Sequence, residues 1–131
     1  MLNVILYDDF VIDYNDLKSS LLETQLSVDC HMKITINEKI FYNDWICPIE
    51  FYYQYCKWKN NCKESNDYSD FEYVTEDNGV NPILKFQYIG NNNWRIDSCY
   101  KEYDEANIFT TEQIKFFFDQ YEIQLFEHVK S

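Results

Sequence analysis

The segment LSVDCHMKITI at residues 26–36 alternates apolar and polar side chains throughout, and this alternation constrains the fold more than any other stretch. Its apolar side chains fall on one set of alternate positions: Leu26, Val28, Cys30, Met32, Ile34 and Ile36. Because successive side chains of a strand point to opposite faces, the pattern predicts a strand with one buried and one exposed face. Other elements of the chain must then cover the buried face.

Residues 83–89 and 94–101 also alternate and are predicted to form a hairpin, with a further strand at residues 71–75. The turn falls on Gly90, Asn91 and Asn92, residue types that tolerate left-handed φ. In the predicted register, two apolar pairs share one face and two polar pairs share the other: Tyr88 with Trp94, Phe86 with Ile96, Lys85 with Asp97, and Gln87 with Arg95. Ser98 and Tyr100 are expected to continue the buried face.

Residues 48–59 predict a helix that is apolar on two sides, with Pro48 in its first turn. The first stripe contains Ile49, Tyr52, Tyr53 and Cys56, and the second contains Phe51, Tyr55 and Trp58. Such a helix is either sandwiched between the sheet and another element or uses its second stripe to meet a partner. The sandwiched arrangement is favoured, because apolar helical stripes usually belong to a core. The polar residues 60–70 are expected to form a loop.

The C-terminal helix is predicted to begin at Thr110, with Gln113 as its capping-box partner. Its core stripe contains Ile114, Phe117, Phe118, Tyr121 and Leu125, whereas Phe116 and Ile123 lie off it. Near the N-terminus, residues 3–14 are expected to be extended. Residues 15–24 are expected to form a short helix that is capped by Asn15 or Asp16 and turns three leucines inward: Leu17, Leu21 and Leu22.

These elements predict one α+β domain over residues 1–131. The expected architecture is an antiparallel sheet of about five strands, with helices packed on one face and an amphipathic helix at the C-terminus.

Composition limits the class of protein. The chain holds twelve Tyr, ten Phe and three Trp, enough apolar surface for a folded core despite a net charge of −12. Its two Gly residues cannot build a phosphate loop or a dinucleotide fingerprint. The acidic excess predicts no direct contact with nucleic acid or an anionic membrane, and it favours a basic partner.

The lack of a signal-peptide or membrane-spanning pattern, together with the cysteine spacing, predicts a cytoplasmic protein. The chain opens without a basic leader and apolar run, and no stretch approaches about 18 consecutive apolar residues. The five cysteines show no paired spacing and are interpreted as free thiols in a reducing compartment.

Residues 91–105, NNNWRIDSCYKEYDE, hold the strongest candidate for catalysis, because a guanidinium at Arg95 near Cys99 would lower a thiol pKa. Alternate residues of a strand share a face in any case, so the favoured interpretation is ordinary surface pairing across the hairpin, Arg95 with Gln87 and Asp97 with Lys85. The two histidines are far apart in the sequence, the cysteine spacings do not fit zinc, and residues 67–79 lack a glycine at the sixth position of a calcium loop. We therefore predict no catalytic residue, no metal site and no cofactor, and expect a binding protein rather than an enzyme.

Acidic residues gather in three segments of the chain. Six lie between Glu64 and Asp77 without a basic residue, four lie between Asp8 and Asp16, and a third group lies at residues 102–105. Such loops can simply keep a protein soluble, but tyrosines inside an acidic field are typical of a surface that attracts a basic protein. The predicted partner-binding residues are Asp67, Tyr68, Asp70, Glu72, Glu76, Asp77, Glu102, Tyr103, Asp104 and Glu105.

The overall layout resembles the small acidic immunity proteins that bacteria make against contact-dependent and other polymorphic toxins. Four segments carry the resemblance: the strand LSVDCHMKITIN, the aromatic helix PIEFYYQYCKWK, the strand pair PILKFQYIGNNNWRIDS and the closing helix FTTEQIKFFFDQYEIQLFE. The resemblance implies a cytoplasmic antitoxin that binds the basic C-terminal domain of a cognate toxin, often a nuclease, without doing chemistry. Binding surfaces vary within such families, so no family residue is transferred to this sequence.

Three alternatives remain open. A DNA mimic would inhibit a nucleic-acid-binding protein by presenting carboxylates in place of phosphates. A small enzyme of unknown type would use a pocket between the sheet and the aromatic helix, with Cys99 or His31. A homodimer would use the second apolar stripes of the helices.

Overall fold

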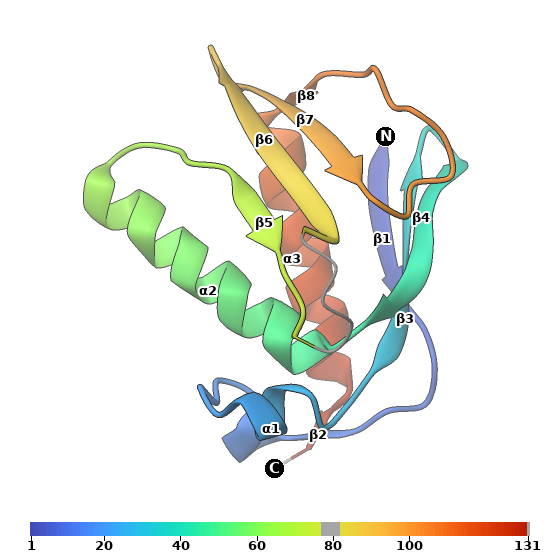
Figure 1. The fold of residues 1–131 in the computed structure, drawn as a ribbon, viewed down its shortest axis with the longest axis vertical. Coiled ribbons are helices and arrows are strands. Elements are labelled where there is room, and N and C mark those ends of the chain that lie inside the picture. The colour runs from blue at the N-terminus through green and yellow to red at the C-terminus, as the bar shows by residue number, and fades with distance from the viewer. Residues whose placement is uncertain (77–81, 131) are drawn as a thin grey trace.

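The computed structural model describes residues 1–76 and 82–130 and combines helices with antiparallel sheets (Figure 1). It confirms the α+β class and the C-terminal helix predicted from the sequence. The elements follow one another as β1 (Leu2–Leu6), β2 (Ile12–Asp13), the 3-10 turn η1 (Tyr14–Asp16), α1 (Leu22–Gln25), β3 (Cys30–Ile36), β4 (Lys39–Ile46), α2 (Pro48–Ser65), β5 (Phe71–Tyr73), β6 (Leu84–Gly90), β7 (Asn93–Ser98), β8 (Phe109–Thr110), α3 (Thr111–Glu127) and β9 (Val129–Lys130).

The strands of the described residues divide among three sheets rather than forming one. Their orders are β1-β3-β4 and β5-β6-β7-β8, and the short β2 and β9 pair in parallel. The sequence did not predict β4, because its burial does not alternate and both Phe41 and Tyr42 are buried. A register shift between Ile34 and Thr35 places an extra residue in β4, and the ring of Tyr103 covers Phe41 at a centroid distance of 5.7 Å.

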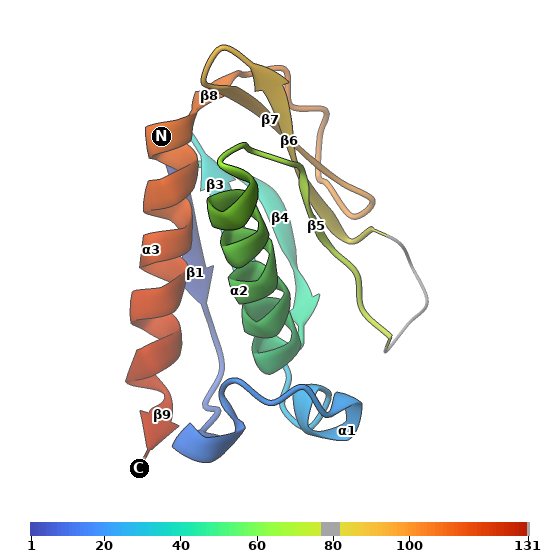
Figure 2. The same ribbon diagram turned by 90° about the vertical axis from the view of Figure 1, so that its left-hand side faces the viewer.

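The two long helices pack against each other and against both larger sheets. Figure 2 shows α2 between α3 and the four-stranded sheet. The ring centroid of Phe51 in α2 lies 5.5 Å from that of Phe71 in β5 and 4.6 Å from that of Tyr121 in α3. The prediction that α2 is sandwiched is therefore confirmed, and its second apolar stripe is used inside the chain.

The hairpin of β6 and β7 has the predicted register on both faces. Trp94 lies opposite Tyr88 and is fully buried, while Lys85 lies opposite Asp97 on the outer face. All three turn residues have positive φ, as predicted: Gly90 at 89°, Asn91 at 53° and Asn92 at 66°. Tyr100 lies beyond the end of β7 and is 37% exposed, so the buried face ends at Ser98.

The predicted start and core stripe of α3 are confirmed. The Thr110 hydroxyl accepts a hydrogen bond from the Gln113 N–H at 3.2 Å, and the Gln113 side chain accepts one from the Thr110 N–H at 2.8 Å. The buried core residues of the predicted stripe are Ile114, Phe117, Phe118, Tyr121 and Leu125, whereas Phe116 and Ile123 are exposed. Farther along, the Gln124 amide accepts from the Leu6 N–H and donates to the Val4 carbonyl, which closes the edge of β1.

Several element boundaries differ from the sequence prediction. The strand expected over residues 26–36 begins only at Cys30, although residues 30–36 alternate in burial as predicted. The helix expected over residues 15–24 is wrong, since η1 and α1 are separate. The Ser19 hydroxyl accepts a hydrogen bond from the Leu21 N–H, a local bond that competes with a continuous helix. The predicted loop at 60–70 starts only at Asn66, where left-handed backbone ends α2.

The predicted inward leucines of residues 15–24 have two different environments. Leu17 is buried, whereas Leu21 and Leu22 are exposed. Within residues 1–76 and 82–130, none of the helices has the length and apolar character needed to span a bilayer.

Candidate functional site

The side chains of the acidic segment at residues 64–77 lie in different environments. Asp67 is exposed after α2, and its carboxylate accepts a hydrogen bond from the Tyr68 N–H at 2.8 Å. The Tyr68 ring packs 5.6 Å from the ring of Trp94, so it lines an aromatic groove instead of standing free in the acidic loop. Glu72 is exposed on β5, and the Glu76 N–H donates to the buried Glu50 carboxylate at 3.2 Å. Asp77 lies outside the described residues.

The acidic segment at residues 102–105 folds over β4. The Glu102 N–H donates to the Phe41 carbonyl at 2.8 Å, which holds the segment against this strand. The Tyr103 ring lies 4.0 Å below the ammonium of Lys39, and its hydroxyl donates to the Glu105 carboxylate at 3.0 Å. Asp104 is 96% exposed. Tyr103 and Glu105 are therefore half-buried and held in place, while Glu102 and Asp104 face solvent.

The acidic segments at residues 64–77 and 102–105 are joined by a row of charged side chains that runs over the outer face of the four-stranded sheet and continues after β7. Figure 2 shows that this face of the sheet is turned away from α2 and α3. Lys85 on β6 lies 4.0 Å from the carboxylates of Asp70 and Glu72, and it is opposite Asp97 of β7. Lys101 then pairs with Asp97 at 2.8 Å and with Asp104 at 3.5 Å. We call this set the charged row: Asp70, Glu72, Lys85, Asp97, Lys101 and Asp104.

Carboxylates outnumber lysines by four to two in the charged row. Partial burial raises the pKa of Asp97, but hydrogen bonds from Lys101 and from the Ser98 N–H outweigh it and leave this pKa below the ordinary value of 3.8. The hydrogen bond to Asp97 in turn raises the pKa of Lys101. Both groups are therefore charged at neutral pH, and the row presents a net negative surface.

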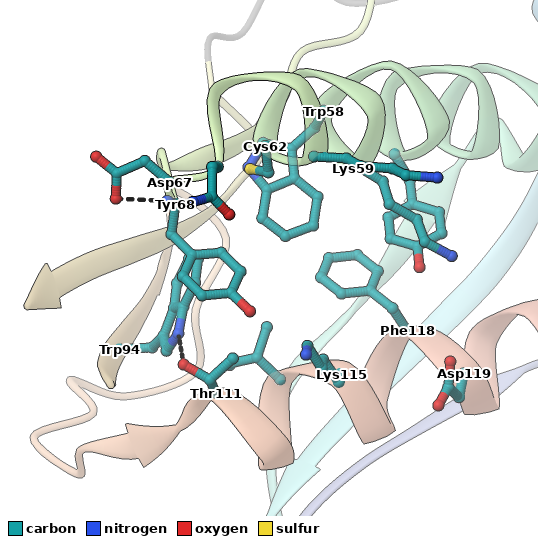
Figure 3. A pocket seen from close by; sticks show the side chains of 14 residues that line it. Trp58, Lys59, Cys62, Asp67, Tyr68, Trp94, Thr111, Lys115, Phe118 and Asp119 are labelled. Atoms are coloured by element: carbon teal, nitrogen blue, oxygen red, sulfur yellow. Dashed lines mark hydrogen bonds between the residues drawn. The ribbon is translucent and has the colours of Figure 1, made fainter. Parts of the chain in front are cut away.

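A separate groove opens between α2 and α3 (Figure 3). Its volume is about 510 Å³, and Trp94 of β7 and Tyr68 of the loop after α2 close one end. Figure 3 shows the rings of Trp58 and Phe118 pointing into it from the two helices, with the Tyr68 hydroxyl directed inward. Its rim carries three lysines, Lys59, Lys63 and Lys115, and two aspartates, Asp67 and Asp119.

Sequence reasoning missed the groove because four separate segments build it. Trp58 and Phe118 both belong to apolar stripes, and a stripe by itself does not reveal that two helices diverge. The available signal was the cluster of Lys59 and Lys63 beside aromatic residues in an otherwise acidic chain.

The activation of Cys99 by Arg95, which the sequence pattern did not favour, has no support in the structure. Burial raises the pKa of the Cys99 thiol, and the carboxylates of Asp44 and Asp97 add to this effect. The other candidate for an enzyme site, His31, pairs with Asp8 at 3.1 Å and lies with its ring centroid 3.8 Å from that of Trp45. Among residues 1–76 and 82–130, no three His, Cys, Asp or Glu side chains gather closely enough to hold a metal ion.

The fold and its surfaces define a small acidic α+β protein with a charged sheet face and an aromatic groove. The chain belongs to a family described as a domain of unknown function (DUF7878), whose model matches residues 7–131. Neither the curated proteins nor the solved structures contain a match to it.

Proposed function

We propose that this chain is an immunity protein that neutralises a toxin in the cytoplasm by binding its basic, nuclease-type domain. The charged row is the observation that carries the proposal, because it joins the two acidic segments across one solvent-facing sheet. The exposed carboxylate of Glu102 adds to this surface beyond β7. The layout resemblance to acidic immunity proteins gives the proposal its biological setting.

The charged row suits a basic partner for a specific physical reason. Lys85 and Lys101 are the only cations of the row, so each is shared between two or more carboxylates. Lysines and arginines of a partner would add the missing positive charge. Charge pairs that lose water at the interface contribute on the order of 1.5–7 kcal/mol of coupling, and pairs at a wet rim contribute much less. The net charge of −12 also accelerates encounter with a basic protein at low salt.

The alternative functions receive less support from the geometry. A DNA mimic needs carboxylates without intervening cations, whereas Lys85 and Lys101 interrupt the row. A homodimer through the second stripe of α2 would need side chains that already contact β5 and α3, such as Phe51. An enzyme with a Cys99 nucleophile would need a lowered thiol pKa, and this pKa is raised.

Co-expression tests the proposal. The C-terminal domain of the polypeptide encoded immediately upstream is produced in bacteria with and without this chain, and growth is measured. We expect the domain to be basic, to arrest growth alone, and to lose its toxicity when this chain is present and bound to it. A non-toxic upstream domain, or one that remains toxic with the chain present, would overturn the proposal.

A further inference from the structure

We propose that the groove between α2 and α3 is a binding site for a small, flat aromatic carboxylate. This inference rests on the groove alone and is independent of the proposed toxin partner. The volume of about 510 Å³ lies within the range of about 300–1,000 Å³ that is typical of small-molecule sites.

The groove walls are aromatic rings that are held in place before any ligand binds. The indole N–H of Trp58 donates to the Ser69 carbonyl at 2.8 Å, and that of Trp94 donates to the Thr111 hydroxyl at 2.9 Å. The two indole rings meet edge to face with centroids 6.1 Å apart. Because both indole N–H groups are satisfied within the chain, the walls are ordered beforehand and little ordering entropy is lost on binding. Trp94 is buried, so the half-buried rings of Trp58 and Tyr68 present the aromatic surface to a guest.

The charges at the rim select an anionic guest. Three of the chain's eleven Lys and Arg residues line this groove with only two of its 23 acidic residues, which reverses the acidic excess of the whole chain. None of Lys59, Lys63 and Lys115 forms an ion pair with the described residues. Lys59 lies 5.8 Å from the ring centroid of Tyr55, at the aromatic wall. Figure 3 shows Lys59 and Lys115 coming from the two facing helices.

A carboxylate on a planar ring system fits both features. The ring system would lie against the exposed parts of Trp58 and Tyr68, with its carboxylate at the lysines and the inward Tyr68 hydroxyl as a further donor. A cationic aromatic compound of the same shape would place its charge against the lysines, and it should bind more weakly.

The test uses 2-naphthoate as the probe and 2-naphthylmethylammonium as its cationic counterpart, each titrated into the full chain. Binding is followed through the indole N–H signals of the three tryptophans by NMR. We expect 2-naphthoate to shift the signals of Trp58 and Trp94 and to leave Trp45, which does not line the groove, unchanged. The cation should bind at least about tenfold more weakly, since attraction is replaced by repulsion.

Lysine-to-glutamine variants test which positive charges 2-naphthoate needs for binding. Lys59→Gln and Lys115→Gln should each weaken 2-naphthoate binding about threefold, the effect of one partly exposed ion pair. Lys57→Gln is the matched control, because Lys57 lies on α2 outside the groove and its loss changes the net charge equally. Equal affinity for the two probes, equal effects of all three substitutions, or no shift at Trp58 and Trp94 with millimolar 2-naphthoate would overturn the inference.

Discussion

Replacing Tyr73 with phenylalanine removes one hydroxyl that joins two buried groups. Tyr73 and Glu50 are each 1% exposed, and the tyrosine hydroxyl donates to the Glu50 carboxylate at 2.8 Å. The same oxygen accepts from the Cys47 N–H at 3.1 Å, at the start of α2. The hydroxyl therefore ties β5 to the first turn of α2, where a carboxylate is also favoured by the helix dipole.

The cost of Tyr73→Phe follows from these two bonds. A hydrogen bond to a charged group is worth about 1.5–3 kcal/mol, and the bond from Cys47 adds about 0.5–1.5 kcal/mol. Tyr73→Phe should therefore lower the free energy of unfolding by about 2–4.5 kcal/mol, a large part of the roughly 5–15 kcal/mol typical of a domain. Urea denaturation measures it as a lower midpoint with an unchanged slope.

A matched substitution separates the network from the loss of any tyrosine hydroxyl. Tyr53 is a half-buried residue of α2 whose hydroxyl makes no hydrogen bond to the described part of the chain. Tyr53→Phe should change stability by less than about 0.5 kcal/mol. If Tyr73→Phe were equally mild, the bonds from Tyr73 would not stabilise the contact between α2 and β5, and this reasoning would be refuted.

Three further substitutions test local features of the fold by urea denaturation. Thr110→Ala removes the hydroxyl that accepts from the Gln113 N–H and should cost about 1 kcal/mol; no loss would exclude the cap as a stabilising element. Gly90→Ala meets no atom within 4 Å, yet the φ of 89° should make it cost about 1–2 kcal/mol, and a neutral result would contradict that turn geometry. Asp97→Asn should destabilise the chain at neutral pH, because the folded-state pKa of this carboxyl is lowered. That loss should begin to shrink as the pH falls below 3.8 and should vanish once the pH is below the lowered pKa of folded Asp97, and a pH-independent difference would show that its charge is not involved.

Sequence patterns correctly predicted the elements whose interacting residues lie close together in the chain. The β6–β7 register followed from alternation and from a turn at Gly90, because only one pairing satisfies both faces. The start of α3 followed from the reciprocal bonds available to Thr110 and Gln113. Both features depend on residues close together in the sequence.

Features set by distant segments were not predicted. The strand β4 has no alternating pattern, because a bulge and the overlying Tyr103 bury two consecutive residues, Phe41 and Tyr42. The sequence likewise identified Tyr68 as an acidic-loop tyrosine, but could not show that its ring reaches Trp94 and Tyr88. Only part of the charged row was predicted. The sequence placed Lys85 opposite Asp97, but it did not predict the ion pair between Lys101 and Asp104.

The central claim is that the charged row receives a basic protein, and association kinetics with the upstream-encoded toxin domain test it most directly. The variant Glu72→Lys with Asp104→Lys reverses two exposed charges of the row. Glu23→Lys with Glu127→Lys makes the same change in net charge on exposed positions of α1 and α3. We predict that the row variant associates at least about tenfold more slowly than the control variant at low salt, and that this difference shrinks at high salt. Equal association rates for the two variants would contradict the claim.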